Sequence, residues 1–156
     1  MSIHLNEIKG VKCSSIASGI KNNNSLDLSL ISLVEGSSTA AVFTQNIFCA
    51  APVLVAKNHL NFNIQALLIN SGNANAGTGK KGLEDSFKSC EIIAEELNIK
   101  PEQVLPFSTG VIGQLLPVES IEKNANKLVN SLTEDGLGNV AKGILTTDLV
   151  EKYCSI

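Results

Sequence analysis

Apolar residues recur at helical spacing in two long stretches of the chain, and they alternate or run together in several shorter ones. The first periodic stretch predicts an amphipathic helix over about residues 82–97, because its apolar positions lie three or four residues apart with Glu and Lys between them. These positions are Leu83, Phe87, Cys90, Ala94 and Leu97. The same spacing predicts a second helix over residues 118–132.

Strands are predicted where the period is two or where short apolar runs are bounded by turn residues. Residues 26–30 alternate, which is typical of a strand with one buried face, and the pattern slips at Leu30 and Ile31. The continuous run within residues 65–70 favours a central strand. Two further short strands are predicted over residues 39–43 and 52–56.

The remaining segments complete a mixed order of elements. Pro101 is expected to open a short helical turn before a strand or loop over residues 104–107, and a short segment follows near residues 141–145. Residues 1–9 are expected to be a loose or edge segment. The order predicts an α/β (α+β) fold in which residues 1–156 form a single portion, without an internal repeat or boundary.

The composition indicates that another chain or segment covers part of the surface. Hydrophobic residues make up 44% of the chain and charged residues only 17%, against about 25% in typical soluble domains. One explanation is a large surface that another chain or segment covers. The net charge is −3 and all 12 basic residues are Lys, which argues against a nucleic-acid partner.

The cysteines predict neither a metal site nor a disulfide framework. Cys13, Cys49, Cys90 and Cys154 lie far apart and are expected to act as buried filler. The chain shows no leader pattern and no apolar run of about 18 residues, so neither export nor a membrane span is expected. A cytoplasmic location follows as the expectation.

Residues 74–81 resemble a phosphate-binding loop only in part. They follow a strand, contain Gly79-Lys80 and precede a helix, but Ala74 stands where such a loop begins with Gly and Lys81 stands where it has Ser or Thr. Nucleotide binding is therefore not expected, no cofactor is predicted, and Lys80 and Lys81 are assigned to a solvated face.

Two polar loops carry the candidate chemistry. In the first, Asn70, Gly72, Asn73 and Asn75 form either a structural tight turn or the lining of a cleft at the end of a strand. In the second, residues 108–110 form either an ordinary turn or an oxyanion hole.

The oxyanion interpretation rests on two donors. The Thr109 hydroxyl and the Gly110 N–H would stabilise negative charge that develops on a carbonyl oxygen. Residues 146–148, Thr-Thr-Asp, form either a helix-end cap or a substrate contact. Neither His4 nor His59 has a sequence neighbour that suggests a triad, so the chain is interpreted as part of an active site.

Several segments together resemble a known family. They are residues 19–28, 40–46, 50–53, 69–76, 108–117 and 143–148. In this order they resemble the bifunctional ArgJ family of arginine biosynthesis, also called ornithine acetyltransferases or glutamate N-acetyltransferases. The resemblance covers nearly the whole chain from Gly10 onward.

The resemblance implies a fold and an activity. The fold is the DmpA/ArgJ type, a sandwich of sheets flanked by helices, which would be incomplete without the β-chain portion. The activity is acetyl transfer from N2-acetylornithine to glutamate, with acetyl-CoA as a further donor in some members. Members cut themselves before an internal Thr, which becomes the nucleophile, and assemble as α2β2 heterotetramers.

By the same resemblance, Thr109 and Gly110 form the oxyanion hole, and Thr146 or Thr147 contacts the ornithine-type substrate. The chain departs from the family pattern because the catalytic Lys and the Ala-Thr cleavage junction would lie beyond Ile156, so truncation is expected. Gly77 also stands where many members have Cys. A non-catalytic remnant serving binding or assembly, and an aminopeptidase of the same fold, stay open as alternatives.

Overall fold

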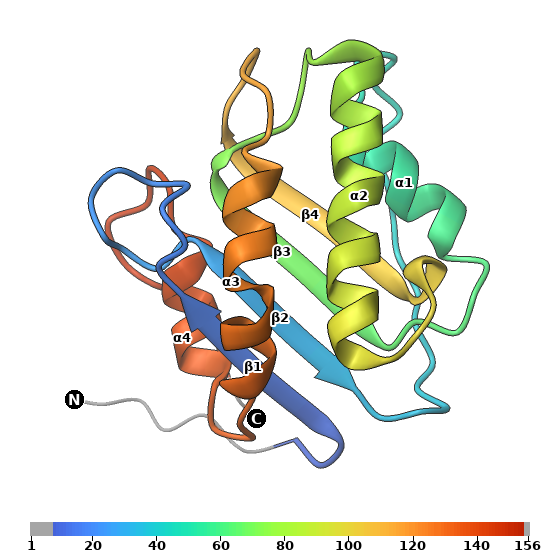
Figure 1. Ribbon diagram of the computed structural model, residues 1–156, viewed down its shortest axis with the longest axis vertical. Helices are drawn as coiled ribbons and strands as arrows, with labels where there is room; N and C mark the ends of the chain where they lie inside the picture. The colour runs from blue at the N-terminus through green and yellow to red at the C-terminus, as the bar shows by residue number, and fades with distance from the viewer. Residues whose placement is uncertain (1–7, 155–156) are drawn as a thin grey trace.

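The computed structural model describes residues 8–154 and consists of one sheet with helices on both of its faces (Figure 1). The strands are β1 (Val11–Ile16), β2 (Leu28–Leu33), β3 (Ala66–Asn73) and β4 (Val104–Val111). The helices are α1 (Ala51–His59), α2 (Gly79–Leu97), α3 (Val118–Asn130) and α4 (Leu137–Gly143), with a 3-10 turn at Pro101–Gln103. This mixed architecture confirms the predicted fold class.

The sheet has the strand order β1-β2-β3-β4. β1 and β3 both run antiparallel to β2, whereas β3 and β4 are parallel. A parallel pair needs a long crossover, and α2 supplies it between β3 and β4. As a result, the two polar segments lie at the same end of the sheet. They were predicted as turns or loops, but residues 70–73 are the last residues of β3 and residues 108–110 belong to the end of β4, where the two strands still pair.

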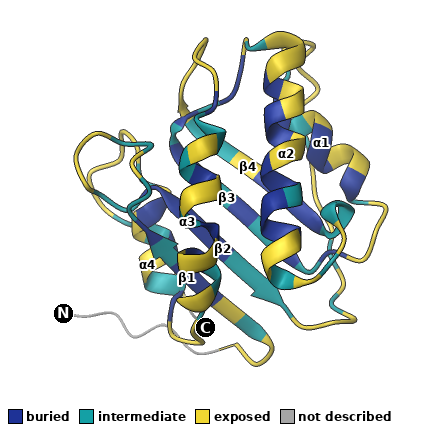
Figure 2. Ribbon diagram, viewed as in Figure 1, coloured by how far each residue is buried: buried dark blue, intermediate teal, exposed yellow. Residues whose placement is uncertain are grey.

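The two long amphipathic helices cover one face of the sheet. α2 and α3 lie side by side in front of the strands, with their buried sides toward the sheet and their exposed sides outward (Figure 2). The main core between them and the sheet includes Leu28, Leu30, Leu68, Ile93 and Leu128. The Ser14 hydroxyl donates to the Leu128 carbonyl at 2.8 Å, so even the polar side chain on this face is satisfied.

The short helix α4 packs on the opposite face, at the ends of β1 and β2. Its approach depends on small residues, because a Cβ at Gly136 would overlap the Cys13 backbone and one at Gly143 would overlap the Ser15 and Ser29 hydroxyls. The Ser71 hydroxyl of β3 donates to the Gly143 carbonyl. The end of α4 is therefore fixed against the centre of the sheet.

Helix α1 covers the outer edge of β4. The His59 Nδ1 lies 2.8 Å from the Val104 carbonyl oxygen, and the His59 ring meets the Phe87 ring edge-on at 5.6 Å. An exposed strand edge invites pairing with other chains, and this helix removes that opportunity along the first part of β4.

Two predicted strands are wrong, and one observed strand was not predicted. The strand predicted over residues 52–56 is wrong, because these residues belong to α1, in which Pro52 occupies the first turn. The strand predicted over residues 39–43 is also wrong, because this segment is irregular. β1 was not predicted, and the expectation for residues 1–7, including His4, lies outside the described residues.

The other predicted elements are confirmed with modest shifts. The helices predicted over residues 82–97 and 118–132 correspond to α2 and α3, and the strand predicted over residues 65–70 corresponds to β3. The strand predicted over residues 26–30 begins slightly later, as β2. Residues 104–107 form the first half of β4, and the segment near residues 141–145 overlaps the end of α4.

Large apolar side chains remain exposed on the irregular segment before α1 and around the end of β4. Val42 and Ile47 are fully exposed, and Phe48 and Ile112 are 66% and 63% exposed. A Cβ at Gly77 would lie 3.4 Å from Phe48 and 3.7 Å from Ile112, so both side chains lie close to this glycine. A surface of this kind is typical of an interaction site.

Two glycines face each other where β3 and β4 end. Gly72 and Gly110 are register partners, with φ angles of +101° and +136°, and the register shifts directly after Gly72. A Cβ at Gly110 would overlap the Gly72 backbone and lie 2.6 Å from the Asn73 nitrogen. The strands can therefore approach here only without side chains.

Replacing Gly110 by Ala is expected to lower the free energy of unfolding of the native protein by about 3 kcal/mol or more, because strain at positive φ adds to overlap with backbone. Gly113→Ala is the matched control, since Gly113 also has a positive φ (+83°) but open space at its Cβ position. We expect it to cost only about 1–2 kcal/mol. Equal losses in denaturant unfolding would contradict the close approach.

Burial should protect two of the cysteines from alkylation. Desolvation raises the pKa of the Cys13 thiol, and it raises the pKa of Cys90 to about 12. Since the thiolate is the reactive species, neither should react with iodoacetamide at pH 8 in the native protein, and both should react after unfolding. Mass spectrometry of the labelled peptides checks this, and rapid native labelling of Cys90 would contradict the packing.

Candidate active site

The candidate oxyanion residues lie at the end of β4, beside the end of β3. Ser71 is the register partner of Thr109, and Gly72 is the partner of Gly110. Thr109 is half-buried and Gly110 is exposed. Among the hydrogen bonds between described residues, none uses the Thr109 hydroxyl. This hydroxyl is therefore available to a ligand, and it stands next to Gly110, which is exposed and carries no side chain.

The three asparagines of the first polar loop are buried and bonded within the protein. The Asn70 amide donates to the Asn73 carbonyl at 2.8 Å and accepts a hydrogen bond from the Ser108 hydroxyl at 2.6 Å. The Asn73 amide donates to the carbonyls of Gln114 and Leu115 at 3.2 and 3.0 Å. Asn70 and Asn73 therefore tie the end of β3 to the segment that begins with Ser108.

Asn75 completes this arrangement at the start of α2. It has a φ of +45°, its amide donates to the Gly82 carbonyl at 2.9 Å, and its Oδ1 accepts from Thr78 at 2.8 Å. Of the residues named as cleft lining, Asn70 thus joins the ends of β3 and β4, Asn73 holds the segment after β4, and Asn75 holds the start of α2. What they leave toward solvent in this region is the backbone around Gly72.

Asp27 organises a second loop beside Gly72. Its buried carboxylate accepts from the N–H and hydroxyl of Ser18 at 2.6 and 2.8 Å, and from the Lys21 N–H at 2.8 Å. Backbone N–H groups that converge on one carboxylate fix the path of residues 18–21. This loop brings the Lys21 side chain across the sheet.

Lys21 joins this loop to the segment after α4. Its Nζ donates to the Leu145 carbonyl at 2.6 Å and to the Leu26 carbonyl at 3.1 Å. Its aliphatic stem passes close to Gly72, where a Cβ would lie 2.9 Å from Lys21 Cγ. Burial lowers the pKa of Lys21, and the charge of Asp27 acts in the opposite direction.

Thr146 lines a cavity that Lys21 also lines. The cavity has a volume of about 430 Å³. Its lining residues are Lys21, Asn23, Ser25, Leu26, Lys142, Leu145 and Thr146. Lys21 and Lys142 give this cavity positive charge, which suits an anionic or polar ligand. Thr146 and Thr147 are both exposed, and Thr146 is the one that faces this cavity.

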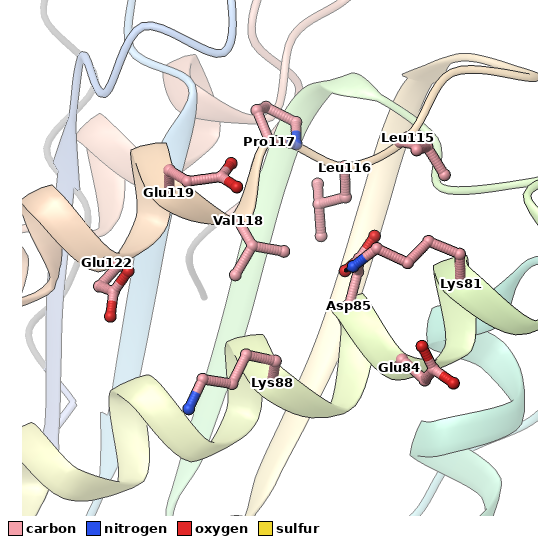
Figure 3. Close-up of a pocket in the computed structure, with 10 residues that line it drawn as sticks. All are labelled: Lys81, Glu84, Asp85, Lys88, Leu115, Leu116, Pro117, Val118, Glu119 and Glu122. Atoms are coloured by element: carbon pink, nitrogen blue, oxygen red, sulfur yellow. Dashed lines mark hydrogen bonds and ion pairs between the residues drawn. The ribbon is translucent and has the colours of Figure 1, made fainter.

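A larger cavity of about 520 Å³ lies elsewhere, between α2 and the start of α3 (Figure 3). Glu84, Glu119 and Glu122 contribute negative charge to it. Lys81, assigned above to a solvated face, pairs here with Asp85, whose side chain is only 5% exposed. The hydrogen bond to Asp85 raises the pKa of Lys81.

The structure therefore brings the sequence-predicted motifs into one region, and it adds residues that the sequence did not single out. Ser71, Asp27 and Lys21 connect the ends of β3, β4 and α4. Among residues 8–154, no cluster of three His, Cys, Asp or Glu side chains could hold a metal ion. Over the same residues, no helix is long and apolar enough to cross a bilayer.

Comparison with known proteins places this geometry in a family. The ArgJ family profile matches residues 12–156. The arginine biosynthesis bifunctional protein ArgJ of Methylococcus capsulatus is 49% identical over 146 residues, which cover 94% of this chain and 36% of that protein. The ArgJ protein of Pseudomonas syringae pv. tomato is 42% identical, over 97% of this chain and 37% of that protein.

Solved structures agree with the sequence comparison. The crystal structure of ArgJ from Bacillus halodurans matches with a TM-score of 0.88 and 35% identity, over 97% of this chain and 82% of that one. The ornithine acetyltransferase from Mycobacterium tuberculosis, solved in complex with ornithine, matches with a TM-score of 0.86 and 33% identity, over 91% of this chain and 78% of that one.

The chain spans little more than a third of the length of these curated relatives. Its fold follows the ArgJ structures over nearly all of its own length, and its sequence matches the family profile from Lys12 to Ile156. The chain belongs to the ArgJ family.

Proposed function

We propose that this chain supplies the oxyanion hole and part of the substrate site of an acetyltransferase of arginine biosynthesis. The reaction moves the acetyl group of N2-acetylornithine to glutamate through an acyl-threonine intermediate, with acetyl-CoA as a further candidate donor. The observation that carries the proposal is the free Thr109 hydroxyl beside the uncovered Gly110 backbone, at the meeting point of β3 and β4.

The chemistry needs a donor pair where charge develops. Attack of a threonine hydroxyl on the acetyl carbonyl carbon forms a C–O bond and turns the carbonyl oxygen into an oxyanion. Thr109 and Gly110 donate to that oxygen, while the hydroxyl proton passes to the threonine's own α-amine. When the intermediate collapses, the C–N bond breaks and the ornithine amine leaves with that proton. The amine of glutamate then attacks the acetyl ester, and the same two donors serve the second tetrahedral intermediate. The nucleophilic threonine belongs to the complementary portion of the enzyme.

Substrate recognition is assigned to the segment after α4. Thr146 or Thr147 contacts the ornithine-type substrate, and the lining of the nearby cavity supports Thr146. The ornithine complex of the structural relative from Mycobacterium tuberculosis supports a ligand of this class. Ser71, the register partner of Thr109, donates to the Gly143 carbonyl, and this link supports a substrate site shared by the oxyanion residues and the segment after α4.

The partner that completes the site is the β-chain portion of the same enzyme, in an α2β2 assembly. The low charge content and the exposed apolar side chains support a large covered surface. Val42, Ile47, Phe48 and Ile112 are candidates for that contact, since exposed apolar side chains of this size favour burial against a partner.

Thr109→Ala in the complete, self-processed enzyme is expected to lower kcat for acetyl transfer by roughly 10²–10³, the scale of one lost oxyanion donor. Thr109→Ser is the matched control, because it keeps the hydroxyl, and its kcat should stay within about tenfold of wild type. Steady-state rates with acetylornithine and glutamate measure both variants. An alanine variant as fast as the serine variant would remove Thr109 from the mechanism.

The substrate contact can be assigned by isosteric replacement. One of the two valine variants, Thr146→Val or Thr147→Val, should lose a hydrogen bond to substrate. That variant should have a KM for acetylornithine raised by about tenfold, and the other should stay near wild type. The lining of the cavity leads us to expect the larger effect at Thr146. If acetyl transfer is absent while short peptides are hydrolysed, an aminopeptidase replaces this proposal.

A further inference from the structure

Lys21 connects the candidate oxyanion residues with the candidate substrate segment through contacts to residues that lie far from it along the chain. Its ammonium bonds a carbonyl that lies 124 residues away along the chain, directly before Thr146. Its stem lies against Gly72, which in turn faces Gly110 across the strand pair. One side chain therefore touches the backbone under the candidate oxyanion hole and the backbone before the candidate substrate residue.

We propose that Lys21 is a positioning residue that holds the segment around Thr146 in place relative to Thr109 and Gly110. This inference rests on the proposed function, because it concerns the geometry of that same substrate site. Lys21 acts through the Leu145 carbonyl and need not touch the substrate.

Three features of the structure support a positioning role. First, Lys21 is itself held in place, because its backbone N–H donates to the buried Asp27 carboxylate at 2.8 Å. Second, two of the three ammonium protons are used on backbone carbonyls, at 2.6 and 3.1 Å. A charged donor to a carbonyl is stronger than a neutral one, and partial burial strengthens it further.

Third, the Thr146 segment has little packing of its own. Ile144, Thr146, Thr147 and Asp148 are exposed, and Leu149 is 97% exposed. The start of the segment is held by two backbone hydrogen bonds to α4, from the Ile144 N–H at 3.1 Å and from the Leu145 N–H at 3.2 Å. Beyond them, the bond from Lys21 is the contact that fixes the Leu145 carbonyl toward the sheet.

The test uses Lys21→Met in the complete, self-processed enzyme, because methionine keeps an unbranched apolar stem against Gly72 and removes the ammonium. Loss of a charge-assisted hydrogen bond should raise KM for acetylornithine about tenfold to a hundredfold, while kcat falls by less than about fivefold because the oxyanion donors stay in place. Lys21→Arg, which keeps the charge and donors, should restore KM to within about fivefold of wild type.

Lys123→Met is the control, since Lys123 is an exposed lysine on the outer side of α3. It should leave KM and kcat unchanged. A wild-type KM in Lys21→Met, or a fall in kcat and melting temperature without a change in KM, would overturn the positioning role. If Lys21→Met does not fold, Lys21→Arg decides the question. A KM of Lys21→Arg as high as that of Thr146→Val would then also overturn the positioning role.

A second readout separates this inference from the proposed function. Removing the bond to Leu145 should speed chymotryptic cleavage within residues 144–150 in Lys21→Met but not in Lys123→Met, whether or not acetyl transfer is observed. Inactive wild-type enzyme would refute the acetyltransferase proposal, and unchanged cleavage would refute the role of Lys21.

Discussion

Where β3 and β4 end, the backbones of these neighbouring strands approach each other closely, and the candidate site depends on this close approach. Gly72 and Gly110 face each other with no room for a Cβ. Because the strands stay together to this point, Thr109 lies beside Ser71, which is bonded to the end of α4. The asparagine side chains then hold the two loops in that arrangement.

Sequence periodicity predicted the elements that pack against the sheet but not those that pack at its edges. α2 and α3 follow their apolar spacing, because one side of each helix faces the core. The apolar run at residues 52–56 was too short to separate strand from helix, and Pro52 at the first helical turn was the missed signal. β1 was missed because Ser14, a polar residue, is buried there through its bond to Leu128.

The motifs of the site were readable from the sequence, but their connections were not. Thr109, Gly110 and the Thr-Thr pair stood out by residue type and by family resemblance, whereas the choice between tight turn and cleft lining at Asn70–Asn75 needed the hydrogen bonds. Lys21 could not be found by spacing, because its partner carbonyl is 124 residues away. Such links exist only once the chain has folded.

The facing glycines also restrict how this protein can be redesigned. A side chain at Gly110 would overlap the backbone of β3, and one at Gly72 would press on the side chains of Lys21 and Ile20, so neither position can be varied without moving its neighbours. Substitutions are better placed at Asn23, Ser25 and Lys142, which surround the cavity without supporting the sheet. The lining of this cavity can thus be varied on one loop and one helix end while the strand pair stays unchanged.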